Sequence, residues 1–339
     1  MSTALVISSR FQSSRFRPSR SRLLSGLLAL AILSFPAFAK APAAATRPVP
    51  VIFDTDIGND VDDCLALAIL HSFASRGEIR LLAVTITKDN PWASRLASTI
   101  DRFYGRPGIP IGVVSNGQTK DDGYLKKTID AGHYSYSDRT EDAVALLRRV
   151  LTAEPDGSVV IVQVGFSTNL AHLLEAPDGR GLVAKKVNRL VLMAGDFAGG
   201  PAEYNVKTDV AAAQKVARDW PTPLYWSGFE VGRTIKYPAA SIERDFGPPG
   251  ANPVADAYRH YLKMPYDRET WDLTAALYAV RPGDGYLTAS AEGVVAVDAH
   301  GNTKFQARPG GLHHVLSVND IQRARILEAF LWLCTESHR

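Results

Sequence analysis

Five aspartates that lie close together near residue 60 have the residue type and the spacing to do chemistry. They fall within ten residues, as Asp54, Asp56, Asp60, Asp62 and Asp63. Carboxylates at this density repel one another unless a cation, backbone N–H groups or the hydroxyls of a sugar compensate their charge. Oxygen ligands without Cys or His favour a hard cation, Ca²⁺ before Mg²⁺, over Zn²⁺. The sequence therefore predicts a divalent metal site here rather than a solvated acidic loop.

The residues on either side of the aspartates predict the elements that must position them. Residues 48–53 are apolar and bounded by Pro, as is typical of a buried parallel strand, and residues 64–70 are typical of a helix. Gly58 and Asn59 favour a turn between the two, and Asp60 is a candidate for the helix N-cap. In an open α/β sheet, ligands bind beyond the carboxyl ends of the strands. We therefore expect the aspartates at the mouth of a site.

The run Asp-Thr-Asp-Ile-Gly, closed by an Asp pair at residues 62–63, resembles the signature of the inosine-uridine-preferring nucleoside hydrolase family. Residues 165–170 and 202–205 resemble two further segments of that family, and the resemblance extends from about Pro48 to the last helix. It implies an α/β fold with a Rossmann-like core, in which an open, doubly wound, mostly parallel sheet is flanked by helices. It also implies an N-ribosylhydrolase that cleaves the N-glycosidic bond of ribonucleosides, or of a related ribosylated compound, into base and ribose.

The resemblance also implies how a metal would be held. Its ligands would be Asp56, Asp63, Asp272 and the main-chain carbonyl of Val164, with Ca²⁺ as the expected ion and Mg²⁺ as the alternative. Asp56 would also be the general base that activates water. The sequence has two residues more between the turn glycine and the Asp pair than the commonest family pattern. We align the final pair because the helix follows it directly, and Asp60 stays open as the alternative ligand.

The same resemblance implies the substrate contacts. Asp62 would accept a hydrogen bond from the 2′-hydroxyl of ribose, and Asn90, Glu203 and Asn205 would contact the sugar, with a helix cap as the alternative role of Asn90. Trp271 stands where the family usually has a His that protonates a purine leaving group. A Trp in place of this His removes an acid and leaves a surface on which the base can stack. Trp92 or a Tyr of residues 115–139 is a candidate partner in this stacking.

Composition and the N-terminus predict where the protein acts. The chain has 339 residues, 46% of them hydrophobic, and a net charge of +3, so it can bury a large core. Arginines precede an apolar stretch at residues 23–35 and a small-x-small site at residues 37–39, which predicts a signal peptide over residues 1–39 and export to the periplasm or the extracellular space. Residues 40–47, rich in Ala and Pro, predict a linker to one domain, residues 48–339.

The rest of the chain bears on its partners. Lys and Arg nearly balance Asp and Glu outside the N-terminus and no second apolar span follows, so we expect neither nucleic-acid binding nor a membrane anchor after cleavage. A nucleoside is the expected partner, and the resemblance implies a homodimer or homotetramer with a role in nucleoside metabolism. Residues 115–139 are a candidate lid. Cys64 and Cys334 are either free core residues or a disulfide.

The C-terminal residues predict a return to β structure. Residues 293–297 and 303–307 flank a Gly-Asn turn and predict a small hairpin. His313 and His314 are predicted in an edge strand, where neighbouring side chains point to opposite faces, so that the two do not form a metal pair.

Two other functions compete with the hydrolase. An Asp-x-Asp after a first strand also begins haloacid-dehalogenase-like phosphatases, in which Asp54 would be the nucleophile. That reading leaves Asp60 and the Asp pair without a role. A non-catalytic, exported nucleoside- or sugar-binding protein of the same fold is the other alternative, because the acid that the family uses is missing.

Overall fold

The first apolar run forms β1 (Val49–Thr55), at the middle of the central sheet of the computed structural model, which describes residues 47–336. β1 lies between β2 (Ile79–Ile86) and β5 (Val159–Gln163) and is parallel to both. Its side chains alternate, so that Phe53 packs into the core on one face of the sheet and Ile52 into the core on the other, each with no exposed surface. Burial on both faces explains why the run is continuously apolar.

The sheet is doubly wound. Its strand order is β12-β11-β13-β7-β6-β5-β1-β2-β3-β4, with β10 paired to β13. After β1 the chain builds outward through β2, β3 and β4, and then returns to the other side of β1 for β5, β6 and β7, all in parallel. This reversal creates a topological switch point at β1 and β5, where ligands of such folds bind. The remaining bounds are β3 (Ile111–Val113), β4 (Glu141–Asp142), β6 (Val187–Met193) and β7 (Leu224–Ser227).

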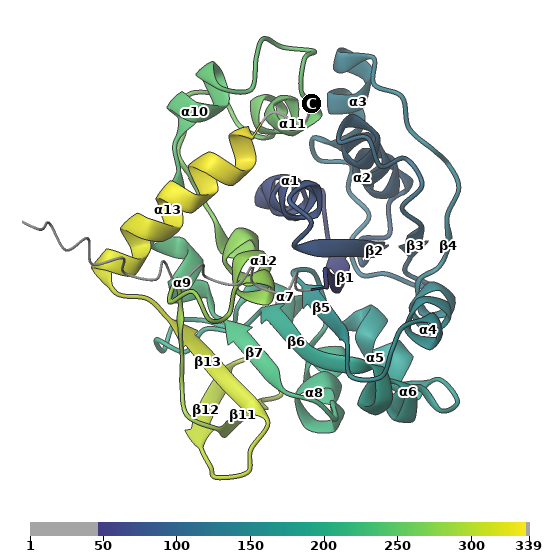
Figure 1. Ribbon diagram of the computed structural model, residues 1–339, viewed down its shortest axis with the longest axis vertical. Helices are drawn as coiled ribbons and strands as arrows, with labels where there is room; N and C mark the ends of the chain where they lie inside the picture. Colours follow the sequence, from purple (N-terminus) through teal and green to yellow (C-terminus); the bar gives the residue numbers. More distant parts are fainter. Residues whose placement is uncertain (1–46, 337–339) are drawn as a thin grey trace, which may run out of the picture. The chain divides into compact units, whose positions relative to one another are not determined.

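Helices cover both faces of the sheet, as Figure 1 shows. One side carries α1 (Asp62–Ser75), α2 (Pro91–Phe103), α12 (Trp271–Val280) and α13 (Asp320–Thr335). The other side carries α4 (Ala143–Ala153), α5 (Thr168–Glu175), α6 (Gly179–Lys186) and α8 (Val210–Asp219). The predicted fold class, an open α/β sheet flanked by helices, is therefore confirmed. Within residues 47–336, no helix has the length and apolarity that a membrane crossing requires.

The C-terminal hairpin is confirmed, but its neighbour is not an edge strand. β11 (Gly293–Val297) and β12 (Thr303–Ala307) pair in antiparallel register. β13 (His313–Ser317) lies between β11 and β7 and runs parallel to β7. The prediction of an edge position was wrong because a parallel pairing with a strand almost 90 residues earlier leaves no local signal.

The two histidines of β13 point to opposite faces, as strand geometry requires. His313 stacks on Trp226 and His314 stacks on Tyr225, with ring centroids 5.8 and 4.8 Å apart. They therefore act as packing residues of the sheet.

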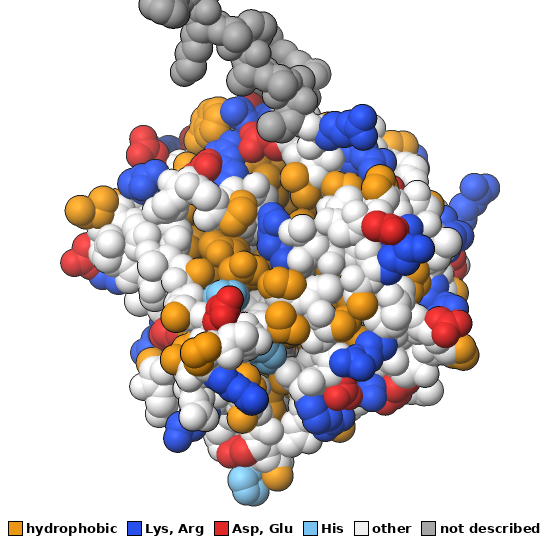
Figure 2. Space-filling view, turned by 60° about the horizontal axis from the view of Figure 1, so that its bottom comes forward, with side chains coloured by type: hydrophobic (Ala, Val, Ile, Leu, Met, Phe, Trp, Pro, Cys, Tyr) orange, Lys and Arg blue, Asp and Glu red, His pale blue; other side chains and the backbone are white. Residues whose placement is uncertain are grey.

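Short elements complete the fold. They are α3 (Leu125–Gly132), α7 (Tyr204–Thr208), α9 (Phe229–Arg233), α10 (Ala239–Arg244), α11 (Pro253–Tyr261), β8 (Lys236–Tyr237), β9 (Arg268–Glu269) and β10 (Thr288–Ala289). Cys64 and Cys334 are both free and buried, so the structure has no disulfide between them. On the face drawn in Figure 2, Lys and Arg are interspersed with Asp and Glu, and no basic stripe runs across it. The predicted signal peptide, residues 1–39, lies outside the described residues, as does nearly all of the linker.

Candidate functional site

The loop between β1 and α1 places the aspartates at the carboxyl edge of the sheet. Gly58 has a φ of +114°, and a Cβ there would lie 2.6 Å from the side chain of Leu125, so the turn requires glycine. The helix N-cap is Val61, not Asp60 as predicted. The Asp60 carboxylate instead accepts a hydrogen bond of 2.9 Å from Nε of Arg268 and forms an ion pair with that guanidinium. A cation from another part of the chain thus displaces the local cap.

A pocket of about 390 Å³ opens at this edge. Its walls include residues at the carboxyl ends of four neighbouring strands: Asp56 after β1, Val164 after β5, Met193 at the end of β6 and Phe229 after β7. The other lining residues are Asn59, Asp60, Asp62, Asp63, Asp121, Glu203, Tyr204, Asn205, Tyr261, Trp271 and Asp272. Residues from the first loop and from the distant α12 therefore share one cavity, as the sequence predicts.

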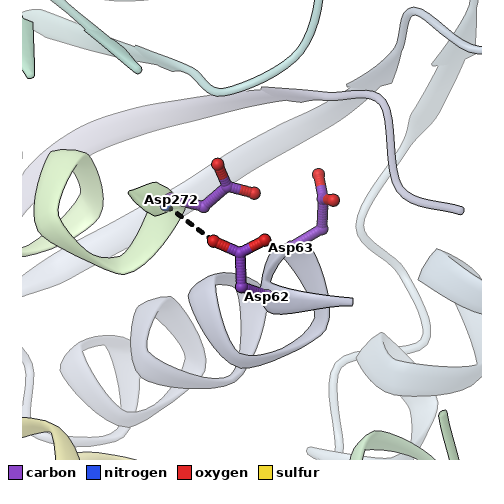
Figure 3. Close-up of side chains that lie close together, drawn as sticks. All are labelled: Asp62, Asp63 and Asp272. Carbon is purple, nitrogen blue, oxygen red and sulfur yellow. Dashed lines mark hydrogen bonds between the residues drawn. The ribbon is translucent and has the colours of Figure 1, made fainter. Parts of the chain in front are cut away.

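Three carboxylates in this pocket lie close enough to bind a single ion. One oxygen from each of Asp62, Asp63 and Asp272 lies within 4.8 Å of the others, and all three residues are buried. Figure 3 shows the first two at the start of α1, with Asp272 facing them from the start of α12. The backbone N–H of Asp272 donates to Asp62 over 3.0 Å, and the Thr55 hydroxyl donates to Asp63. We call these three residues the carboxylate triad.

The electrostatics of the triad fit a hard divalent cation. Burial, and then the neighbouring carboxylates, raise the pKa of each triad residue well above its ordinary value. The nearby guanidinium of Arg268 is paired with Asp60 and not with the triad. Val164 lines the same pocket, and its carbonyl accepts a hydrogen bond of 2.7 Å from Asn205, which leaves this oxygen one more lone pair. Buried oxygen donors with uncompensated charge are the kind of site that Ca²⁺ occupies.

We expect Ca²⁺ to stabilise the protein, and to do so more at about pH 7.5 than at about pH 5, because protons compete for the triad. Folding raises the pKa values of the three triad carboxylates above their ordinary value. The protein without a cation therefore loses stability as the pH rises above the ordinary carboxyl value of about 4, and the cation offsets that loss. At a free Ca²⁺ concentration 100 times Kd, the gain is about 2.7 kcal/mol. Calorimetric Tm with Ca²⁺ and with EDTA at both pH values measures it. An equal shift at both pH values contradicts a carboxylate site.

The triad differs from the ligand set expected from the sequence in one member. Asp62 belongs to the carboxylate triad, whereas Asp56 lines the same pocket but is not part of the triad. The reason is local: the N–H of Asp272 draws Asp62 toward α12, while Nδ2 of Asn59 holds Oδ2 of Asp56 over 2.8 Å. Burial raises the pKa of Asp56 to about 6, so this carboxylate is mostly ionised at neutral pH.

Glu203 and Asn205 face the pocket from the start of α7. The Glu203 carboxylate caps this helix by accepting from the backbone N–H groups of Asn205 at 2.8 Å and Val206 at 3.2 Å, and it also accepts from the N–H of Gly195, outside the helix, at 3.1 Å. Burial nevertheless raises its pKa to about 7. Nδ2 of Asn205 donates to the carbonyls of Val164 and Met193. Both predicted ribose contacts are thus fixed in orientation within the pocket.

Asn90 is not brought into the pocket. Its Oδ1 accepts from the backbone N–H of Trp92 at the start of α2, which is the capping role that the sequence left open. Its Nδ2 donates to the carbonyls of Lys120 and Asp121. Asn90 thereby fixes the first part of the candidate lid, residues 115–139, from which Asp121 reaches the pocket.

Aromatic side chains form one wall of the pocket. Trp271 stacks on Phe229 at 5.3 Å between ring centroids, and its Nε1–H donates to the Phe229 carbonyl over 2.9 Å. Gly232 permits this packing, because a Cβ there would lie 2.3 Å from Cα of Trp271. Tyr204 and Tyr261 line the same pocket. Phe229 and Tyr261 were missed from the sequence, and the one available signal was the position of Phe229 just after a strand.

Two predicted alternatives for the stacking partner lie elsewhere. Trp92 is not among the pocket residues; it packs edge-to-face on Tyr136 and carries the guanidinium of Arg95 over its ring. Trp92 is therefore packed against one tyrosine of the candidate lid, and none of the lid tyrosines, Tyr124, Tyr134 and Tyr136, lines the pocket.

Asp54 cannot serve as a nucleophile in this structure. Its side chain has no exposed surface, and one carboxylate oxygen accepts from Oγ1 of Thr85 at 2.5 Å and from Nδ2 of Asn169 at 2.8 Å. Burial raises its pKa to about 7. A phosphatase of the haloacid-dehalogenase type needs this carboxylate at the substrate, so the geometry opposes that function.

Known proteins resemble this chain in sequence and in fold. The family model described as inosine-uridine preferring nucleoside hydrolase matches residues 51–327. Solved structures of nucleoside hydrolases also align with the chain. A plant nucleoside hydrolase has a TM-score of 0.70 and 21% identity, over 86% of this chain and all of that one. A purine-preferring ribonucleoside hydrolase from Gardnerella vaginalis has a TM-score of 0.67 and 21% identity, over 84% of this chain and 98% of that one.

The third structure, an inosine-guanosine nucleoside hydrolase, has a TM-score of 0.68 and 18% identity, over 84% of this chain and 98% of that chain. At these identities the likeness shows a shared fold. No curated protein matches the chain.

Proposed function

Because this chain belongs to the inosine-uridine preferring nucleoside hydrolase family, we propose that it hydrolyses the N-glycosidic bond of ribonucleosides with the help of Ca²⁺. Hydrolysis of that bond by an N-ribosylhydrolase is what the family and the fold support; the ion and the roles of single residues are our proposal. The observation that carries the proposal is the carboxylate triad, which shares one pocket with Asp56, Glu203 and Asn205.

Asp56 is proposed as the general base. Cleavage leaves positive charge on the sugar, and water must attack C1′ while it loses a proton. The Asp56 carboxylate lines the pocket, and with a pKa of about 6 it is mostly ionised at neutral pH and able to take that proton. The surrounding carboxylates also stabilise the developing positive charge.

Asp62, Asp63, Asp272 and the Val164 carbonyl would hold the cation, with Asp56 as a further candidate ligand. When bound, Ca²⁺ would supply a positive charge that orients sugar hydroxyls and polarises water. Calcium is favoured over magnesium because it accepts six to eight oxygen ligands in flexible arrangements.

The ribose is proposed to lie against Asp62, Glu203 and Asn205. Glu203 is held by three backbone N–H groups, two of which donate to Oε2 and one to Oε1, so Oε1 keeps a lone pair to accept a sugar hydroxyl. The amide of Asn205 is fixed by two carbonyls, so its oxygen is the end that can receive a hydroxyl. A pre-oriented pair of this kind selects a vicinal diol.

We expect Trp271→Ala to raise the KM of nucleosides about tenfold, because stacking of a base on an aromatic ring contributes about 1–3 kcal/mol. Trp271→Phe should keep most of the affinity. Trp332→Ala removes a Trp that is 48% exposed on α13 and serves as the matched control. Steady-state kinetics on purine and pyrimidine nucleosides measure the effect. Unchanged KM values for all of them would remove the stacking role from Trp271.

The deciding experiment incubates the purified mature protein with Ca²⁺ and a panel of nucleosides and assays free reducing sugar. Ribose release that EDTA abolishes supports the proposal. Nucleoside binding without release, at saturating Ca²⁺, overturns it in favour of the non-catalytic binding protein. Trapping with beryllium fluoride tests the phosphatase in the same preparation.

We also propose that the protein is exported and assembles as a homodimer or homotetramer. Export is proposed from the arginine-rich start and the apolar stretch that follows it. Cell fractionation with N-terminal sequencing tests cleavage near residue 39, and light scattering of the mature protein measures the assembly.

A further inference from the structure

A buried lysine stands beside the pocket, and the proposed chemistry gives it no role. Lys88 follows β2, and its side chain has no exposed surface. Its Nζ donates to Oδ1 of Asn59 over 2.6 Å and to Oδ1 of Asp121 over 2.9 Å. Burial of an ammonium group is costly unless it is paired and hydrogen-bonded, so this site is specifically built around the charge.

Asn59 connects this lysine to the proposed base. Its Nδ2 donates to Oδ2 of Asp56 over 2.8 Å and to Oγ1 of Thr119 over 3.2 Å. An ammonium group can only donate, so Lys88 can bind only the oxygen end of the amide. The NH₂ end must then face Asp56. The lysine therefore determines which way the Asn59 amide points.

The loop that carries Asn59 is held from both sides. The loop has two residues more between Gly58 and the Asp pair than the commonest family pattern, and two of its side chains, those of Asn59 and Asp60, each contact a cation from another part of the chain. Lys88 contacts Asn59, and Arg268 contacts Asp60. The longer loop thus brings its own fixing contacts, and one of them reaches Asp56.

We propose that Lys88 is a positioning residue for Asp56 and acts through the amide of Asn59. This inference rests on the proposed function, in which Asp56 accepts the proton of the attacking water. The amide occupies Oδ2 of Asp56, which leaves Oδ1 for that water. Without the lysine the Asn59 amide can flip and set its oxygen against the carboxylate, which turns the carboxylate away.

Lys88→Met tests this relay. We expect kcat to fall about 10- to 100-fold, as for other residues that orient a reacting group, while the KM for the nucleoside stays within about threefold. Lys88→Arg, which also only donates, should recover part of kcat. Lys120→Met is the matched control, because it removes a lysine whose side chain is 76% exposed in the adjacent segment. An unchanged kcat in Lys88→Met overturns the relay.

Asn59→Asp keeps the shape and the contact to Lys88 but replaces the donor to Asp56 by a repelling oxygen. We expect its kcat to fall at least as far as that of Lys88→Met, and this variant decides the question if Lys88→Met does not fold. The double variant Lys88→Met/Asn59→Leu should be no slower than the slower of its two single variants, Lys88→Met and Asn59→Leu. Multiplying losses would mean independent roles and would overturn the relay.

A stability measurement separates this inference from the proposed function. Equilibrium unfolding of the Lys88→Met, Asp56→Ala and double variants measures, without any substrate, how strongly Lys88 and Asp56 are coupled, because Ala removes the contact of residue 56 with Asn59. If Lys88 and Asp56 are coupled in stability, and this coupling vanishes when Asn59 is replaced by Leu, the relay is supported. That result holds even if the wild type releases no ribose, an outcome that would overturn only the proposed hydrolase function. Strict additivity with Asn59 present, in a protein that does release ribose, overturns the relay alone.

Discussion

Asp63→Asn is expected to lower kcat about 10³-fold and to remove the stabilisation by Ca²⁺. Asp63 is a member of the carboxylate triad, and the hydroxyl of Thr55, the last residue of β1, donates to one of its oxygens. The amide keeps the shape of the side chain but loses its charge. A hard cation then has two carboxylates instead of three, and the loss of several kcal/mol of charge stabilisation corresponds to this rate effect.

The measurement combines kcat with the Tm difference between Ca²⁺ and EDTA. The wild type should show both the activity and the shift, whereas the variant in EDTA should be at least as stable as the wild type in EDTA, because one repelling buried charge is gone. Asp122→Asn makes the same change on an exposed residue of the candidate lid and should alter neither quantity. A Ca²⁺ shift that survives in Asp63→Asn would place the ion elsewhere.

The central part of the fold could be predicted because its signals are local. The apolar run of β1 and the helix formers of α1 follow one another directly, and the turn between them carries a glycine that its positive φ requires. The order of strands β1, β2 and β5 then places this turn at the switch point. The acidic residues were therefore located correctly from the sequence, at a mouth beyond a strand end.

Contacts between distant residues could not be predicted. Arg268 lies 208 residues after Asp60, and Lys88 lies 29 residues after Asn59, so neither cation is visible in a pattern around the loop. The helix cap assigned to Asp60 failed for that reason. The charge balance of the site depends on tertiary pairing, which composition cannot reveal.

Asn90 shows the opposite relation between local and family signals. An Asn directly before a Pro at the start of a helix is a strong capping pattern, and the structure uses it in that way. The resemblance pointed instead to a ribose contact. The two roles compete for one amide, and the backbone N–H of Trp92 occupies the oxygen.

Asp56→Asn should lower kcat by about 10²- to 10⁴-fold, the usual contribution of a general base, with little change in KM. An amide cannot take a proton from water. It can turn its oxygen toward Nδ2 of Asn59, so the 2.8 Å contact and the shape of the pocket should survive. The carboxylate triad is untouched by this change, and the Tm shift on adding Ca²⁺ should therefore persist.

The comparison of Asp56→Asn with Asp63→Asn separates proton transfer from ion binding. If Asp56 serves as the base beside an ion held by the triad, its variant loses kcat and keeps the Ca²⁺ shift, whereas Asp63→Asn loses both. Loss of the shift in both variants would instead make Asp56 a principal ligand, as the family signature implies. Activity of Asp56→Asn above about a tenth of wild type would show that another group takes the proton, because a base contributes at least 10²-fold.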